Sequence, residues 1–81
     1  MTDRGKELIR TVREVYGYVP TDWTHESVTE GTSSFPAWED WAGSIQSMPV
    51  LKEILERFAE QGQKRLPPLA QVRARYRQAT G

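Results

Sequence analysis

The chain has 81 residues, of which 37% are hydrophobic and 27% charged, and its formal net charge is zero. A chain of this length builds one hydrophobic core, and its apolar content is too high for a disordered segment. Cysteine is absent, which excludes disulfide bonds and thiolate metal sites. We therefore expect one folded domain over residues 1–81.

No apolar run approaches the roughly 20 residues that a membrane-spanning helix needs. The N-terminus is charged rather than apolar, unlike a secretory signal segment. We expect a cytoplasmic protein that does not enter a membrane.

The charges are unevenly distributed along the chain. Residues 1–20 carry four basic and three acidic side chains, and residues 21–60 carry two basic and eight acidic ones. Residues 61–81 carry five basic side chains and no acidic one. A neutral protein with this distribution can still present local patches of either sign.

The first predicted helix spans about residues 4–16. Asp3 is the expected N-cap, and Gly17 stands where a left-handed residue ends a helix. The apolar face of this helix follows the helical period and consists of Leu8, Ile9, Val12, Val15 and Tyr16.

Residues 17–34 are rich in glycine and hydroxyl side chains, which predicts an irregular segment. Thr24 is a candidate cap for one short helical turn through Val28, which would end at Gly31. A loop this long in a compact domain is often functional. We expect four apolar or aromatic side chains to hold it against the rest of the molecule: Tyr18, Val19, Trp23 and Val28.

Two further helices are predicted at about residues 35–46 and 48–61, each with a proline in its first turn. The first begins near Ser34, and the second is capped by Ser47 and ended by Gly62. Their apolar faces consist of Trp38, Trp41, Ala42 and Ile45 in the first, and Leu51, Ile54, Leu55, Phe58 and Ala59 in the second.

The last predicted helix spans about residues 68–79, after the segment Leu66-Pro67-Pro68-Leu69. Its inward-facing residues are expected to be Leu69, Val72 and Tyr76. The predicted fold class is therefore all-α: a compact, four-helix, bundle-like single domain with a long loop between its first two helices.

The sequence gives little basis for catalysis. The single histidine, His25, lacks the second histidine of a zinc-binding helix, and we interpret it as solvated or capping. Glu53, Glu56 and Glu60 share a helical face, but basic residues lie among them, which favours a solvated face. We therefore expect no enzyme activity, no metal and no cofactor.

The predicted binding residues lie mainly in the basic C-terminal part. Arg73 and Arg77 are four apart and share one helical face, and Lys64 and Arg65 precede that helix. Such a helix N-terminus beside cations can hold a phosphate group. The alternative is a solvated basic face whose arginines pair with the acidic preceding helix. Trp23 is the fifth candidate: it either fills the core or is offered to a partner as an aromatic anchor.

The arrangement also resembles a known family. A helix with Trp38 and Trp41 is followed by a helix, by basic residues and by Leu66-Pro67-Pro68-Leu69, with Gln71 opening the last helix. This layout is similar to the small helical domain of phage-type replicative-helicase loaders of the replication protein P kind, over about residues 6–78. Residues 17–33 depart from that pattern as an insertion.

The resemblance implies a phage-derived adaptor in DNA replication that docks on a replicative helicase or another replication protein. One alternative is a direct nucleic-acid-binding protein that uses the basic C-terminal helix. Another is a phage-encoded inhibitor of a host protein. The sequence leaves these three hypotheses open.

Overall fold

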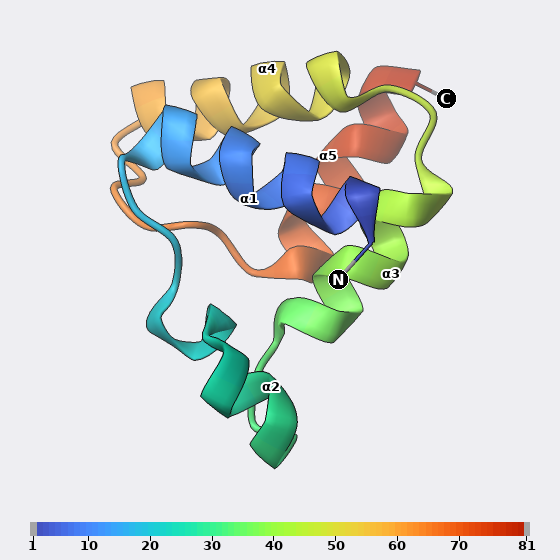
Figure 1. The fold of residues 1–81 in the computed structure, drawn as a ribbon. Coiled ribbons are helices and arrows are strands. Elements are labelled where there is room, and N and C mark those ends of the chain that lie inside the picture. Colours follow the sequence, from blue (N-terminus) through green and yellow to red (C-terminus); the bar gives the residue numbers. More distant parts are fainter. Residues whose placement is uncertain (1, 81) are drawn as a thin grey trace.

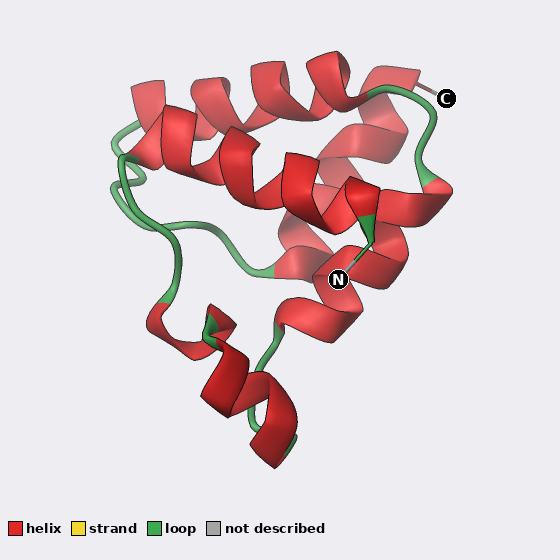
Figure 2. Cartoon of the chain, in the orientation of Figure 1, coloured by secondary structure: helices red, strands yellow, loops and turns green. Residues whose placement is uncertain are grey.

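The computed structural model of this protein describes residues 2–80, and every regular element in that range is helical (Figures 1 and 2). The all-α single domain predicted from the sequence is confirmed. In chain order the elements are α1 (Asp3–Tyr16), the 3₁₀ turn η1 (Thr21–Trp23), α2 (His25–Glu30), α3 (Phe35–Ser44), α4 (Met48–Glu60) and α5 (Leu69–Thr80).

Helix α1 is capped by Thr2 and not, as predicted, by Asp3. The Thr2 hydroxyl oxygen accepts a hydrogen bond from the backbone N–H of Gly5 at 3.0 Å. Asp3 is the first helical residue, where its charge still favours the positive end of the helix. At the other end the prediction is confirmed: Gly17 has φ +79° and its N–H donates to the Arg13 carbonyl at 2.8 Å.

Residues 17–34, called the arm below, project from the other helices at the bottom of Figure 1. The predicted short turn is helix α2, which Thr24 caps by accepting from the Ser27 N–H at 3.2 Å. Gly31 ends it with φ +76°. Of the side chains expected to hold this segment against the rest of the molecule, Tyr18 and Val28 are exposed. Tyr18 still makes a contact outside the arm, because its hydroxyl donates to the Lys64 carbonyl at 3.5 Å.

Helices α3 and α4 are joined by a tight turn. Helix α3 ends at Ser44, two residues before the predicted end, because Ile45 adopts an extended conformation. The Ile45 side chain is buried all the same. Ser47 then caps α4, as predicted, by accepting from the Val50 N–H at 3.4 Å, and Gly62 follows this helix with φ +95°.

The core lies where α1, α3 and α4 meet, and α5 packs against α4 (Figure 1). These four helices, called the body below, meet along the predicted apolar faces. Seven residues of those faces are only partly buried: Ile9, Val15, Tyr16, Trp41, Ala59, Leu69 and Tyr76. Phe35 and Met48, which the sequence analysis did not place in the core, are buried. Within residues 2–80 the buried residues of the hydrophobic core are Leu8, Val12, Trp23, Phe35, Trp38, Ala42, Ile45, Met48, Leu51, Ile54, Leu55, Phe58 and Val72.

The described helices include none that combines enough length with enough apolar character to cross a bilayer. The longest, α1, has 14 residues and a charged outer face.

Candidate binding groove

An open groove of about 780 Å³ lies between α5 and the end of α3 with its turn into α4. It is called the α5 groove below. One wall comes from α5 and the other from residues 41–47. The lining residues are Trp41, Ser44, Ile45, Gln46, Ser47, Ala70, Arg73, Ala74, Tyr76, Arg77 and Thr80.

Local hydrogen bonds fix the wall formed by residues 41–47. The Ser44 hydroxyl donates to the Trp41 carbonyl at 2.6 Å, which satisfies one of the free carbonyls at the end of α3. The backbone N–H of Ser47 donates to the Tyr76 hydroxyl of α5 at 3.3 Å. The turn is therefore tied to α5, so the two walls of the groove keep their relative positions.

Two aromatic rings form the apolar part of the groove. Trp41 and Tyr76 are both half-buried, and their ring centroids lie 5.7 Å apart at an interplanar angle of 87°. This edge-to-face geometry is favourable for aromatic pairs. Trp41 also contacts the buried Trp38, at a centroid distance of 6.1 Å. The rings are thus held from the core side while part of their surface faces the groove.

Arg73 and Arg77 supply the charge of the groove. Both are exposed on successive turns of α5, and neither side chain forms an ion pair or a hydrogen bond with any residue in the range 2–80. No acidic side chain of the described range lines the groove. Within residues 2–80 neither arginine pairs with an acidic side chain of α4, so that part of the alternative is not what the structure shows.

Arg75 is not part of this site, although it lies between the two groove arginines in sequence. Its guanidinium lies over the Phe58 ring of α4, 5.4 Å from the ring centroid. This cation–π contact fixes α5 against α4. The different surroundings of the three arginines follow from their helical positions, because residues two apart lie on opposite sides of a helix.

The structure does not bring Lys64 and Arg65 into the α5 groove. Both are exposed in the segment between α4 and α5, and neither lines the groove. The Lys64 carbonyl accepts a hydrogen bond from the Tyr18 hydroxyl at 3.5 Å, so this part of the chain lies beside the start of the arm. The four predicted cations therefore do not form one patch.

Trp23 is a core residue, which is the first of the two alternatives left open for this candidate binding residue. Its side chain is only 7% exposed, and its ring lies 5.1 Å from Phe35 and 5.7 Å from Trp38, centroid to centroid. The indole N–H donates to the Ser34 hydroxyl at 3.1 Å. A buried indole with a satisfied N–H fills the junction between arm and body and is not available as an exposed anchor.

Asp22 is a polar residue that the sequence analysis did not single out. Its carboxylate accepts a hydrogen bond from the Ser34 backbone N–H at 2.8 Å. This bond, with a second from the Ser34 side chain, holds the pKa of the Asp22 carboxyl below its usual value. Asp22 and Trp23 thus close the arm onto Ser34, which is a structural role rather than a catalytic one.

The described residues contain no group of three or more histidine or acidic side chains placed to share a metal ion. Glu53, Glu56 and Glu60 are exposed on α4, and the first of them is paired with Arg57. The backbone of His25 opens α2, while its side chain, which we interpreted as solvated or capping, lies outside the described part of the structure.

Comparisons with known proteins found no relative of this chain. No protein-family model matches the chain, and no curated protein or solved structure matches it. The α5 groove, which two arginines and two aromatic rings line, is therefore the feature from which a function can be argued.

Proposed function

We propose that this protein is a non-enzymatic adaptor that docks an acidic segment of a protein partner in the α5 groove. The observation that carries the proposal is the pair Arg73 and Arg77, exposed without an ionic partner among residues 2–80, on one wall of a groove that Trp41 and Tyr76 also line. Arginine and aromatic residues are the types that contribute most to protein interfaces.

A protein segment suits this groove better than duplex DNA does. The chain has no net charge, and only two of its eleven basic residues line the groove. A duplex presents a dense line of phosphates that is usually bound by many cations together. An acidic segment with one apolar side chain matches the site more closely, because the carboxylates face the arginines and the apolar group meets Trp41 and Ile45.

The partner that we propose is a DNA-replication protein, with a replicative helicase as the first one to test. This choice rests on the resemblance of the helix layout and of the segment Leu66-Pro67-Pro68-Leu69 to helicase loaders. On this proposal the body is the scaffold, and the groove is the part that recognises the partner.

The test measures binding of purified bacterial replicative helicase by the wild-type chain and by two charge-reversal variants. The first, R73E/R77E, changes the groove. The second, K64E/R65E, makes the same change in net charge at exposed positions outside it. We expect the groove variant to weaken binding by at least about tenfold and the control by less than about twofold, because only the groove arginines would face the partner.

Absence of helicase binding by the wild type would contradict the choice of partner. Equal weakening by both variants would contradict the choice of groove. Direct nucleic-acid binding is a separate outcome that salt dependence would identify. If two phosphates are contacted, a plot of log affinity for duplex DNA against log salt concentration should have a slope of about −2. Such binding, lost in R73E/R77E, would replace the adaptor proposal.

A further inference from the structure

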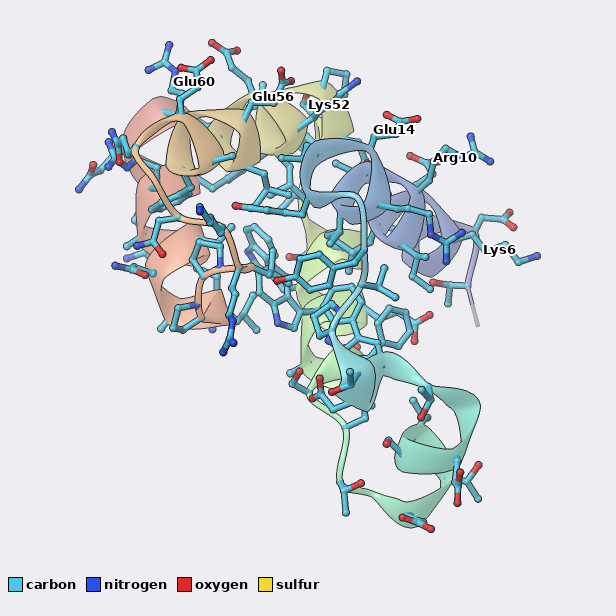
Figure 3. All side chains as sticks on the ribbon, turned by 90° about the vertical axis from the view of Figure 1, so that its left-hand side faces the viewer. Lys6, Arg10, Glu14, Lys52, Glu56 and Glu60 are labelled. Carbon is cyan, nitrogen blue, oxygen red and sulfur yellow. The ribbon has the colours of Figure 1, made fainter. Side chains whose placement is uncertain are left out.

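The outer face of α1 and α4 carries a continuous line of exposed charged side chains, called the charged row below. Figure 3 shows these side chains following one another across the two helices, from the flank of α1 to the flank of α4. In order they are Lys6, Arg10 and Glu14 on α1, then Lys52, Glu56 and Glu60 on α4.

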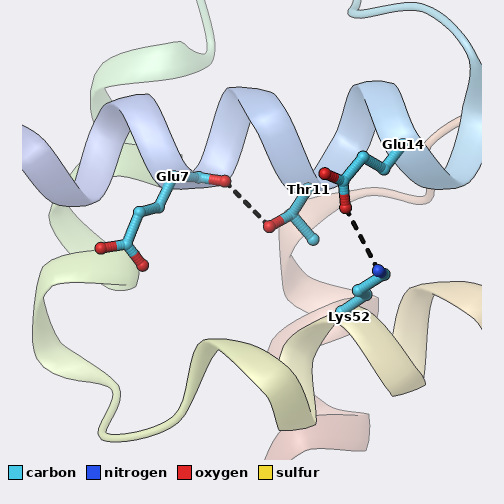
Figure 4. A network of polar contacts seen from close by, with 4 residues as sticks. All are labelled: Glu7, Thr11, Glu14 and Lys52. Atoms are coloured by element: carbon cyan, nitrogen blue, oxygen red, sulfur yellow. Dashed lines mark hydrogen bonds and ion pairs between the residues drawn. The ribbon is translucent and has the colours of Figure 1, made fainter.

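Helix geometry explains why the row is continuous. Within each helix the members are four residues apart, so they lie on one inclined line that advances about 6 Å per step. The two helices run side by side in the same direction (Figure 1). They are joined in the middle of the row, where the Lys52 ammonium lies 3.2 Å from the Glu14 carboxylate (Figure 4). The line on α1 therefore continues along α4.

The order of charges in this row is self-complementary. From Lys6 to Glu60 the signs are positive, positive, negative, positive, negative, negative. When the row is reversed and placed against itself, every position meets a charge of opposite sign. If the two rows instead ran in the same direction, every position would face a charge of the same sign.

Other exposed charges lie near the row, among them the acid Asp3, three residues before Lys6 on α1. Arg13 adds a positive charge to the exposed surface of α1. Glu53 and Arg57 on α4 neutralise each other in an ion pair of 3.1 Å. Glu7, next to Lys6 in the chain, is exposed on the side of α1 that faces the start of α4, as Figure 4 shows.

We propose that the chain associates with a second copy of itself through this face, as a twofold-symmetric dimer. The twofold axis lies in the interface and crosses the row at right angles at the Glu14–Lys52 pair. Lys6 of each copy then faces Glu60 of the other, and Arg10 faces Glu56. The two central pairs form a cluster of four charges with alternating signs. A twofold interface requires a surface that is complementary to itself, and the charged row meets that requirement.

The proposal concerns a different surface from the α5 groove and goes beyond the proposed function. Exposed ion pairs are individually weak and are screened by salt. The dimer is therefore expected to form at high protein concentration and low ionic strength, and to dissociate when salt is added.

Sedimentation equilibrium at about 0.02 M and about 0.5 M salt tests the proposal, with the wild type and three variants. K6E/R10E and E56K/E60K each place like charges opposite one another in the dimer. Their combination in one chain restores the complementary order and the net charge of zero. We expect a dimer for the wild type and the fourfold variant at low salt, and monomers for both double variants. All should be monomers at high salt.

Two variants with matched changes in net charge outside the row serve as controls. R73E/R77E matches K6E/R10E, and E26K/E30K on α2 matches E56K/E60K. Both should dimerise like the wild type. The proposal is overturned if the wild type stays monomeric up to about 1 mM at low salt. It is also overturned if the controls lose the dimer as the row variants do, or if the fourfold variant stays monomeric.

Carbodiimide cross-linking of the unmodified chain gives a second measurement that does not depend on any variant folding. In a mixture of ¹⁴N- and ¹⁵N-labelled protein, links between Lys6 and Glu60 should join a light chain to a heavy one, because these residues lie at opposite ends of the row within one copy. If Glu14–Lys52 links form within chains but no mixed Lys6–Glu60 link appears, the proposed pairing is wrong. R73E/R77E changes only the α5 groove, so it should keep the mixed Lys6–Glu60 link. The link therefore tests the dimer independently of the groove proposal.

Discussion

The body and the arm are folded by different kinds of interaction. In the body, long apolar faces of four helices bury side chains such as Leu8, Leu51 and Leu55 completely. The arm contributes one large side chain, Trp23, to the core and is otherwise closed by hydrogen bonds that converge on Ser34. Because α2 packs mainly on η1 rather than on the body, the arm is expected to open at a lower free energy than the body unfolds.

The largest expected effect is a core truncation in the body. Leu55→Ala removes a fully buried side chain from α4, so we expect it to lower the free energy of unfolding by about 3 kcal/mol. Urea denaturation followed by far-ultraviolet circular dichroism measures this loss. A loss below about 1 kcal/mol would mean that the body is packed less tightly than the structure shows.

Trp23→Phe tests the attachment of the arm. The change removes the hydrogen bond to Ser34, worth about 1 kcal/mol, and part of a buried ring, worth about 1 kcal/mol more. Amide hydrogen exchange should accelerate across residues 21–34 more than in α1 or α4. Equal acceleration of amide exchange along the whole chain would show that arm and body unfold together, and would contradict the expectation that the arm opens at a lower free energy.

Gly17 and Gly31 offer a matched pair of substitutions, one at the end of a body helix and one at the end of α2. Both have a positive φ and open space around the position of a Cβ atom, so alanine at either site costs about 1 kcal/mol of backbone strain. Gly17→Ala should lower the global unfolding free energy by that amount. Gly31→Ala should mainly accelerate amide exchange in the arm. If it lowered the global unfolding free energy as much as Gly17→Ala does, arm and body would not open separately.

The smallest expected effect is the pH dependence of the Asp22–Ser34 contact. The pKa of the Asp22 carboxyl is lower in the folded state than in the unfolded chain, where it is about 3.9. The contact therefore stabilises the arm fully above that value, and the contribution is lost as the pH falls through the folded-state pKa. The NMR shift of the Ser34 amide proton should follow this titration, and Asp22→Asn should abolish it. A Ser34 shift that is independent of pH between about 2 and 5 would show that the bond is absent.

The sequence predicted the helices well because the signals that begin and end them are local. Thr24 and Ser47 cap helices, and Gly17 and Gly31 end them, as expected from their neighbours in the chain. The wrong prediction of Asp3 as the N-cap of α1 is an error of one residue. Thr2 and Asp3 can both act as caps, and Thr2, which has the suitable backbone conformation, does so.

The candidate site was only half predictable. The i, i+4 spacing places Arg73 and Arg77 on one face of α5, and the structure agrees. No sequence spacing indicated that residues 41–47 form the facing wall, or that Lys64 lies beside Tyr18 instead. The burial of Trp23 was also undecided, because an aromatic residue in an irregular segment carries no periodic signal.

By itself the sequence determined the fold class, the number of long helices and the faces that they bury, since these depend on residues within a few positions of one another. The tertiary structure decided which faces remain exposed side by side: the α5 groove, the charged row across α1 and α4, and the closure of the arm over Trp23. The physical reason is that helix packing joins residues far apart in the chain, as Glu14 and Lys52 are, or Ser47 and Tyr76, which lie 29 positions apart. No local pattern encodes such contacts.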